Sequence, residues 1–412
     1  MNIRSKLAVS AVGSAALAAV LLAGSTLAQV GAPFVPRHKL RPALHQPHPG
    51  QLGDALVGLS AEQLALYTAG RDEFEAIETV EGGLGPIFNG NSCAGCHSAG
   101  GVGGASATTV TRFGRVVNGV FDPLDHLGGS LLQDKAIAPA VQETVPPEAN
   151  VVAKRLSTPL FGAGLIEAVP DAEILLGAQR RQPDGVQGRA ALVTDIASGK
   201  TRVGRFGWKA QQATLLAFAG DAYLNEMGVT NRYFPTENAP NGKQALLAIW
   251  DQVPELEDAV GPDGTSDIDH AADFMRLLAP PAPLRTTASA LAGSRVFDRI
   301  HCSACHTPVL LSGASPVAAL AHKPVPLYSD LLLHDMGKLG DGIEQGAAKM
   351  TEMRTAPLWG LRARGPFLHD GRAPTVDAAI RAHEGQGAPS RQRYKDLGAG
   401  ERQQLLDFLA TI

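Results

Sequence analysis

Apolar side chains recur at helical spacing in several stretches of the chain, and residues typical of helix ends flank these stretches. Ser60 and Gln63 form a capping box, in which each side chain bonds the backbone of the other residue, and this predicts a helix that continues towards Glu78. Further helices are predicted over 171–181, over 208–227 with Gly228 as its end, from 267 to the prolines at 280 and 281, over 288–300, over 375–383 and over 401–409.

Extended segments are harder to recognise in this chain than helices. The region from 100 to 150 is predicted to be mostly loop, with a short strand pair around 110–117. A proline-rich stretch over 279–283 is the best candidate for a boundary between two domains.

The first residues have the pattern of a secretory signal peptide. Arg4 and Lys6 precede an apolar stretch over 7–22, and small residues then lead to a predicted cleavage site near Ala28. The apolar stretch is shorter than the roughly 20 residues that cross a bilayer, which argues against an uncleaved membrane anchor. We therefore expect residues 1–28 to be a signal peptide and the mature protein to reside in the periplasm, without stable membrane insertion.

Charge and composition limit the kinds of partner that the chain can bind and the kind of hydrophobic core that it can form. The chain has 36 Lys and Arg against 40 Asp and Glu, a net charge of −4, which argues against a nucleic-acid partner. It contains 46 glycines and 28 prolines but only 5% aromatic residues, so it is rich in loops and short of large apolar side chains. A bound apolar cofactor would supply the missing volume.

The cysteines are the most informative residues, because there are four and all lie in two Cys-x-x-Cys-His motifs. Two thiols at this spacing on a helical turn form thioethers with the two vinyl groups of one haem, and the histidine that follows binds the iron. A zinc site would not require a histidine directly after both pairs, and a redox-active pair normally occurs once. We predict two covalently bound c-type haems, attached through Cys93, Cys96, Cys302 and Cys305, with His97 and His306 as iron ligands.

Each haem motif is followed by a similar turn, at 157–162 after the first and at 355–360 after the second. This weak internal repeat is typical of a duplicated unit. It is expected for two duplicated cytochrome-like units, between which a helical segment lies. The expected boundaries are an N-terminal haem domain over 29–200, a helical linking segment over 201–279 and a C-terminal haem domain over 280–412.

Residues 328–337, 353–361 and 365–372 closely resemble the dihaem oxidoreductase family, which is often labelled thiol oxidoreductase. Residues 160–168 and 206–210 also look like this family. The chain is similar, more distantly, to bacterial dihaem cytochrome c peroxidases and to the dihaem enzyme that matures methylamine dehydrogenase. This resemblance implies a mainly α fold with two cytochrome-c-like haem domains and an intervening helical segment. In the peroxidases the C-terminal haem takes electrons from a small redox protein, and the N-terminal haem then reacts with hydrogen peroxide.

The resemblance also bears on the sixth ligand of the C-terminal haem iron. His383 lies where the peroxidases carry a methionine and the maturation enzyme carries a tyrosine, so the resemblance implies a bis-histidine centre. The alternative is a solvated histidine at a helix end. Met336 is a rival ligand or a core side chain, because methionine is both a soft iron ligand and a common filler of cores. We interpret His334 and His369 as hydrogen-bond partners of haem propionates or of the backbone.

Glu167 is the candidate catalytic base at the N-terminal haem. Cleavage of a peroxide O–O bond needs a group that accepts and returns a proton, and Glu167 lies in an apolar, glycine-flanked run where an unpartnered carboxylate is unusual. The alternative is a structural glutamate paired with Arg155. Trp208 is a candidate electron relay between the haems or a core side chain, and Met227 is expected to be apolar packing.

The sequence therefore favours an exported dihaem c-type cytochrome that acts as a peroxidase-like oxidoreductase, with the C-terminal haem passing electrons to the N-terminal haem. A pure electron-transfer cytochrome and a haem oxygenase acting on an organic substrate stay open as alternatives. The expected partners are a small redox protein and hydrogen peroxide or another small substrate. The peroxidase segment that follows the first Pro-Leu turn, an aromatic-Asp-Gly-Arg run, is replaced here by Gly-Ala-Gly-Leu at 162–165. No motif supports a calcium site, so calcium stays open.

Overall fold

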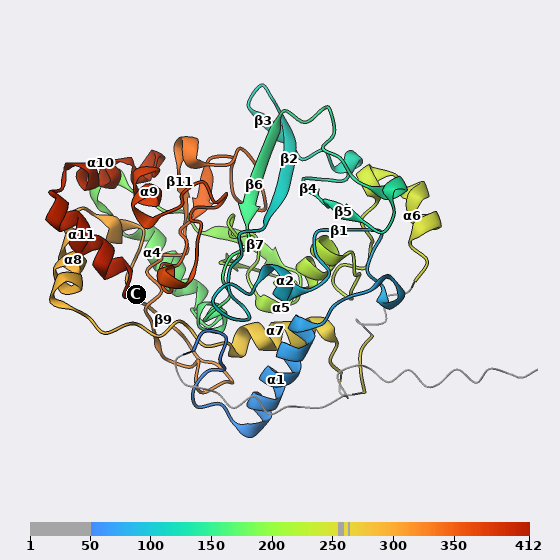
Figure 1. Ribbon diagram of the computed structural model, residues 1–412, viewed down its shortest axis with the longest axis horizontal. Helices are drawn as coiled ribbons and strands as arrows, with labels where there is room; N and C mark the ends of the chain where they lie inside the picture. The colour runs from blue at the N-terminus through green and yellow to red at the C-terminus, as the bar shows by residue number, and fades with distance from the viewer. Residues whose placement is uncertain (1–50, 254–258, 263) are drawn as a thin grey trace, which may run out of the picture. The chain divides into compact units, whose positions relative to one another are not determined.

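The computed structural model describes residues 51–253, 259–262 and 264–412 (Figure 1). The predicted signal peptide over 1–28 lies outside the described residues. The chain is 36% helical and 16% strand, with several small sheets, so the prediction of a mainly α fold was wrong and the fold is mixed α/β. The strands of the described residues form antiparallel pairs in the segments that join the helices. Such short strands carry little periodicity in the sequence.

The first described helix, α1 (Ala61–Glu75), begins as predicted. Ser60 Oγ accepts from Gln63 N at 3.2 Å, and Ser60 N donates to Gln63 Oε1 at 3.0 Å, which confirms the capping box. The buried face of α1 packs on α7 (Asp267–Leu277), where the rings of Phe74 and Phe274 lie 4.7 Å apart. This helix pair forms part of the larger apolar core.

The helix predicted over 208–227 begins later than expected. Helix α5 (Leu215–Ala222) continues into a π-helical turn, η6 (Tyr223–Met227), and Gly228 ends it with a φ of 65°. The residues before α5 cannot extend it, because Gly207 and Ala210 have φ values of 76° and 51°. Helix α4 (Asp171–Gln179) ends two residues before the predicted end, and α3 (Ala163–Glu167) was not predicted.

The largest sheet is built around β2 (Thr109–Val117), where the sequence predicted a strand pair. Strand β2 pairs with β3 (Val120–Asp122), with β4 (Leu131–Leu132) and with β6 (Val151–Leu156). A second hairpin, β7 (Ala191–Asp195) with β8 (Lys200–Gly204), was not predicted. The remaining strands are β1 (Ile87–Phe88), β5 (Lys135–Ala136), β9 (Leu310–Leu311), β10 (Pro324–Val325), β11 (Leu333–Asp335) and β12 (Glu352–Arg354).

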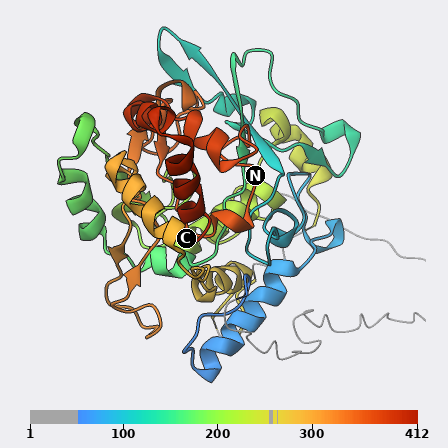
Figure 2. The same cartoon turned by 60° about the vertical axis from the view of Figure 1, so that its left-hand side comes forward.

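The C-terminal part of the chain is built on α8 (Ala288–Arg299) and α11 (Ala399–Leu409), which pack closely together (Figures 1 and 2). A Cβ at Gly293 would come within 1.9 Å of Gln404 O, so this helix contact requires glycine. Phe297 and Phe408 meet edge to face at 5.5 Å in this second core. Shorter helices of the described residues are α6 (Gln244–Trp250), α9 (Val376–Arg381) and α10 (Ala388–Asp396).

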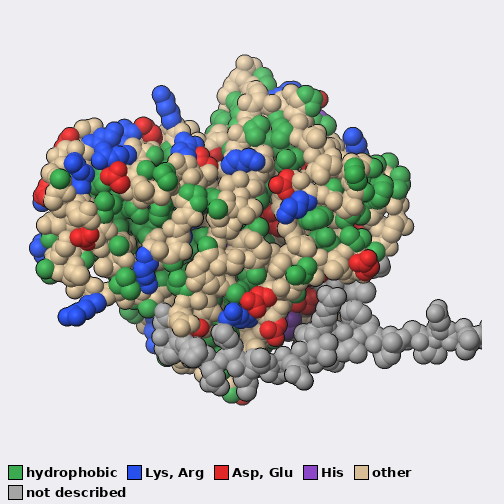
Figure 3. Space-filling view, viewed as in Figure 1, with side chains coloured by type: hydrophobic (Ala, Val, Ile, Leu, Met, Phe, Trp, Pro, Cys, Tyr) green, Lys and Arg blue, Asp and Glu red, His purple; other side chains and the backbone are tan. Residues whose placement is uncertain are grey.

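The two cores do not divide the chain into two simple sequence blocks. The larger core joins residues between 55 and 278 to residues between 310 and 359, and the smaller core uses residues from 290 to 412. Charged side chains of both signs are spread over the face shown in Figure 3. Within the described residues, no helix combines the length and the apolar character needed to cross a membrane. The three expected segment boundaries stay a prediction.

Candidate functional site

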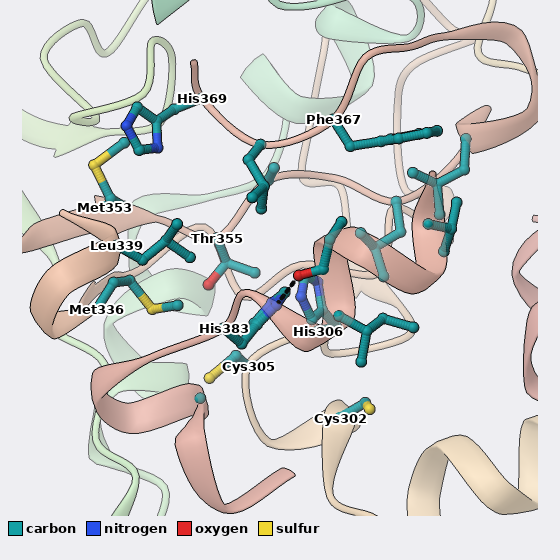
Figure 4. Close-up of a pocket in the computed structure, with 18 of the residues that line it drawn as sticks. Cys302, Cys305, His306, Met336, Leu339, Met353, Thr355, Phe367, His369 and His383 are labelled. Atoms are coloured by element: carbon teal, nitrogen blue, oxygen red, sulfur yellow. Dashed lines mark hydrogen bonds between the residues drawn. The ribbon is translucent and has the colours of Figure 1, made fainter. Parts of the chain in front are cut away.

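The second haem motif opens onto a cavity beside the C-terminal helices. Helix α8 ends at Arg299, His301 takes a φ of 67°, and the short turn η8 (Cys302–Ala304) then carries the first thiol. The cavity has a volume of about 210 Å³. Cys302, Cys305 and His306 form part of its wall (Figure 4). Most of its other lining side chains are apolar. The sequence had predicted a haem at this position.

The rings of His306 and His383 lie next to each other in this cavity (Figure 4). Their ring centres lie 6.4 Å apart, and their planes are inclined by 61°. Nδ1 of His306 lies 3.0 Å from Tyr328 O, and Nδ1 of His383 lies 2.8 Å from Ala379 O. Both Nδ1 atoms therefore donate to carbonyl groups, which leaves Nε2 of each ring free as a ligand atom.

The separation of these two rings fits a single iron ion between them. An imidazole nitrogen binds a metal ion at about 2.0–2.1 Å and lies about 1.1 Å from its ring centre, so two such ligands on opposite sides of one ion have ring centres about 6.3 Å apart. The observed 6.4 Å between His306 and His383 agrees with this value. The thiols of Cys302 and Cys305, the predicted attachment points, lie on the same wall. The residues present thus fit a covalently bound haem.

The electrostatics of the pair also favour ligation. Burial lowers the pKa of His306 to about 3, with a further contribution from His383. Burial likewise lowers the pKa of His383 below its ordinary value. Both imidazoles are therefore neutral at pH 7, and a neutral imidazole is the form that binds a metal ion.

The other sequence candidates near the second motif take different positions. Met336 lines the cavity, but it belongs to the turn after β11 and lies apart from the two neighbouring imidazoles in Figure 4. His334 is buried, with Nε2 2.9 Å from Asp330 Oδ2 and Nδ1 2.8 Å from Gln386 Oε1. Burial acts to lower the pKa of His334, but the hydrogen bond to Asp330 raises it. Ligation of iron by Met336 stays a prediction.

The first haem motif lies on α2 (Cys93–Cys96), next to the larger core. Nδ1 of His97 lies 3.1 Å from Gly104 O, and burial lowers the pKa of His97 to about 4. This is the same arrangement that prepares Nε2 of His306. Among the described residues, the aromatic ring within contact of His97 is that of Phe74, 6.1 Å away, and not a second imidazole.

Trp208 connects the parts of the chain that carry the two motifs. Its indole Nε1 donates to Leu156 O at 2.7 Å, and its carbonyl oxygen accepts from Arg354 N at 2.9 Å. The side chain lines the cavity and lies edge to face with His369 at 6.2 Å. Ser157, on the same wall, donates to Cys96 O at 2.7 Å. Trp208 therefore lies on a cavity wall that reaches from the second motif towards the first.

The structure places Glu167 at the end of α3, outside the lining of the cavity. Glu167 Oε1 accepts from Leu215 N at 2.7 Å, and Oε2 accepts from Arg276 Nε at 2.7 Å. The partner expected from the sequence, Arg155, instead bonds Asp341 at 2.7 Å, so that pairing was wrong. The catalytic role of Glu167 stays a prediction, and both carboxylate oxygens are engaged in structural contacts.

Three arginines on the cavity wall, Arg354, Arg364 and Arg391, were missed by the sequence analysis. Arg354 and Arg364 flank the turn that carries the family resemblance, so their position in the sequence was the one available signal. His369 also lines the cavity, and burial lowers its pKa to about 4. For the calcium ion left open above, the described residues contain no group of three or more His, Cys, Asp or Glu side chains that could hold a metal ion.

Several solved structures share a weak likeness with this chain. Hydrazine synthase of Kuenenia stuttgartiensis is 14% identical, with 97% of this chain and 100% of that chain covered and a TM-score of 0.39. The diheme peroxidase BthA of Burkholderia thailandensis is 13% identical, with 86% of each chain covered and a TM-score of 0.38. A MauG-like protein associated with microbial copper homeostasis is 14% identical, with 61% of this chain and 88% of that chain covered and a TM-score of 0.32. At these values, none of the three defines the function of this chain.

A search of curated protein sequences found no match. The family model described as "Di-haem oxidoreductase, putative peroxidase" matches residues 134–412, which is more than half of the chain. The matched region contains the second haem motif, the neighbouring histidines and the three arginines of the cavity. The chain belongs to the di-haem oxidoreductase family.

Proposed function

We propose that this protein is an exported dihaem c-type cytochrome with peroxidase-like oxidoreductase activity. One haem would be attached through Cys93 and Cys96, with His97 as ligand, and the other through Cys302 and Cys305, with His306 as ligand. Family membership supports a haem oxidoreductase. The use of all four cysteines in two attachment motifs supports two covalent haems per chain.

The observation that carries the proposal is the neighbouring pair of His306 and His383. Two imidazoles at 6.4 Å, each held by a carbonyl at Nδ1, favour an iron ligated from both sides. An iron with two strong protein ligands suits electron transfer rather than the binding of a substrate. His97 lacks a comparable imidazole among the described residues, so the first motif is the proposed site of substrate chemistry.

When bound, the two haems would supply one-electron redox chemistry, with electrons passing from the C-terminal haem to the N-terminal one. The chain contributes the positions of the groups. The carbonyls of Tyr328 and Ala379 orient the two imidazoles, and Trp208 offers an aromatic ring on the wall that reaches from one motif towards the other. The mostly apolar lining of the cavity limits the access of water to the bis-histidine centre.

A second candidate function is that of a pure electron carrier with both irons six-coordinate. The engagement of Glu167 by Arg276 and by the backbone of Leu215 favours this alternative, because it leaves the expected catalytic base occupied. The Gly-Ala-Gly-Leu run at 162–165 also replaces the segment that the peroxidases carry there.

The two functions differ in how many haems bind an external ligand after reduction. We expect one haem per chain to bind carbon monoxide, and we expect the protein to turn over hydrogen peroxide with a reduced small cytochrome as electron donor. A protein whose two haems both refuse carbon monoxide after reduction, and which shows no peroxide turnover, would be an electron carrier instead. An oxygen-dependent reaction without peroxide turnover would indicate an oxygenase.

A further inference from the structure

Among Asp, Glu, Lys and Arg side chains, the described wall of the cavity carries only arginines. Arg354, Arg364 and Arg391 line it, whereas no Asp, Glu or Lys belongs to its described lining. A mostly apolar cavity with buried cations and no acid on its wall favours a ligand that is apolar over most of its surface and carries a negative group. The proposed haem has this character, because its porphyrin ring is apolar and its two propionates are carboxylates.

Arg364 is the guanidinium that most clearly lacks a counter-charge. Its Nη2 donates to Pro357 O at 2.7 Å, and its buried Nε has no hydrogen-bond partner in the described part of the chain. Burial lowers the pKa of Arg364 to about 10, and no acidic side chain acts against this effect. A buried donor and charge without a partner destabilise the fold, so such a group is retained where a ligand completes it.

Arg354 lies close to Arg364 and is bonded to carbonyl groups alone. Its Nε donates to Gly207 O at 2.7 Å and its Nη1 to Thr355 O at 3.2 Å. Burial and the neighbouring Arg364 lower the pKa of Arg354 to about 10, and Asp330 acts in the opposite direction. Two buried cations that repel each other would be stabilised by an anion beside them. Arg391 differs, because its Nη1 already bonds the carboxylate of Glu384.

We propose that Arg364, with Arg354 beside it, binds a propionate carboxylate of the C-terminal haem. The inference rests on the proposed function, since it requires a haem at Cys302 and Cys305. Arg364 lines the same cavity as Cys302, Cys305 and His306, where the C-terminal haem would bind. A guanidinium binds a carboxylate through a charge-assisted hydrogen bond and keeps it ionised.

The test measures the reduction potential of each haem between pH 5 and pH 8 in the holoprotein. Arg364→Gln removes the charge and keeps a shorter, polar side chain with an amide donor. The matched control is Arg362→Gln, because Arg362 lies two residues away, bonds two carbonyls and does not line the cavity. An unpaired propionate makes the haem surroundings more negative and favours ferric iron. We expect the ratio of reduced to oxidised C-terminal haem at pH 8 to fall about tenfold at a fixed applied potential, equal to 59 mV for one electron.

The pH profile separates a propionate partner from a structural arginine. In the wild type we expect the potential of the C-terminal haem to be nearly constant with pH, because the propionate stays ionised. In Arg364→Gln we expect it to rise as the pH falls, because the propionate now takes up a proton. Arg364→Lys should restore the flat profile, and Arg354→Gln should shift the potential in the same direction as Arg364→Gln. Unchanged potentials and profiles in both Gln variants, with both haems attached, would overturn the inference and leave the proposed function standing.

A carboxylate that binds Arg364 could also come from a free small molecule instead of from the haem. If the haem propionate occupies the site, added benzoate should leave the absorption spectrum of the C-terminal haem unchanged in the wild type. A benzoate-dependent change in the wild type that Arg364→Gln abolishes would overturn the propionate assignment. If Arg364→Gln shifted the reduction potential of the N-terminal haem alone, this would also overturn the propionate assignment. A wild-type protein without two covalent haems would overturn the proposed function and this inference together.

Discussion

Asp341→Asn tests the buried ion cluster that joins three distant parts of the chain. Asp341 Oδ2 accepts from Arg155 Nε at 2.7 Å, and Oδ1 lies 2.9 Å from Lys209 Nζ. The side chains of Asp341 and Lys209 are fully buried, and that of Arg155 is 6% exposed. The substitution leaves two buried cations without their shared counter-charge. Breaking a buried ion pair by removing one partner costs about 3–5 kcal/mol, and we expect a loss in unfolding free energy of this size.

The assay is equilibrium denaturation of the holoprotein, with Asp370→Asn as the matched control. Asp370 pairs with Arg372, whose side chain is 49% exposed, so its loss should cost less than about 1 kcal/mol. Burial acts to raise the pKa of Asp341, but Arg155 and Lys209 hold it below its ordinary value. Its contribution to stability is thus complete above the unfolded pKa of about 3.9 and is lost as the pH falls through the lower folded pKa. Equal stability of the Asp341→Asn and Asp370→Asn variants would refute this account of the cluster.

Three further predictions concern the haems and the residues around them. The intact mass should exceed that of the mature polypeptide by two haems, acid–acetone should extract no porphyrin and a maleimide reagent should find no thiol; a stoichiometric thiol titre would contradict thioether attachment at the four cysteines. Trp208→Leu removes the bond to Leu156 and should slow electron transfer between the haems in rapid-mixing kinetics, whereas an unchanged rate would exclude Trp208 as a relay. Met336→Leu should leave the low-spin haem signals unchanged, and loss of a low-spin signal would make Met336 the ligand.

Local chemistry explains which elements could be predicted from the sequence. The capping box at Ser60 and the glycine end at Gly228 depend on neighbouring residues alone, and both are present. The prediction of a helix over the residues before α5 was wrong, because Gly207 and Ala210 take left-handed conformations. Lys209 is also buried against Asp341, which is far away in the sequence. Tertiary contacts of this kind override helical periodicity.

The mixed α/β character of the fold was missed for a related reason. The hairpin of β7 and β8 has five residues in each strand, and its burial alternates only in part. Sheets of two short strands are stabilised by what packs on them rather than by their own pattern. The sequence therefore showed where helices begin more clearly than where strands pair.

In the candidate site too, some residues were indicated by local sequence patterns and others depend on contacts between distant parts of the chain. Spacing indicated the haem motifs and family position indicated His383, and the roles of these residues in binding haem stay predictions. The pairing of Arg155 with Asp341 spans 186 residues, so no local pattern could indicate it. The cationic wall around Arg364 also depends on side chains brought together by folding. The catalytic role of Glu167, proposed from the sequence, stays a prediction.

The EPR spectrum of the ferric protein, compared between the wild type and His383→Ala, tests most directly whether His306 and His383 bind one iron. We expect a low-spin signal of bis-imidazole type in the wild type. In His383→Ala this signal should convert to a high-spin one, while the thioethers at Cys302 and Cys305 remain intact. A spectrum of His383→Ala identical to that of the wild type would contradict the account, because it would show that the two neighbouring rings do not share an iron.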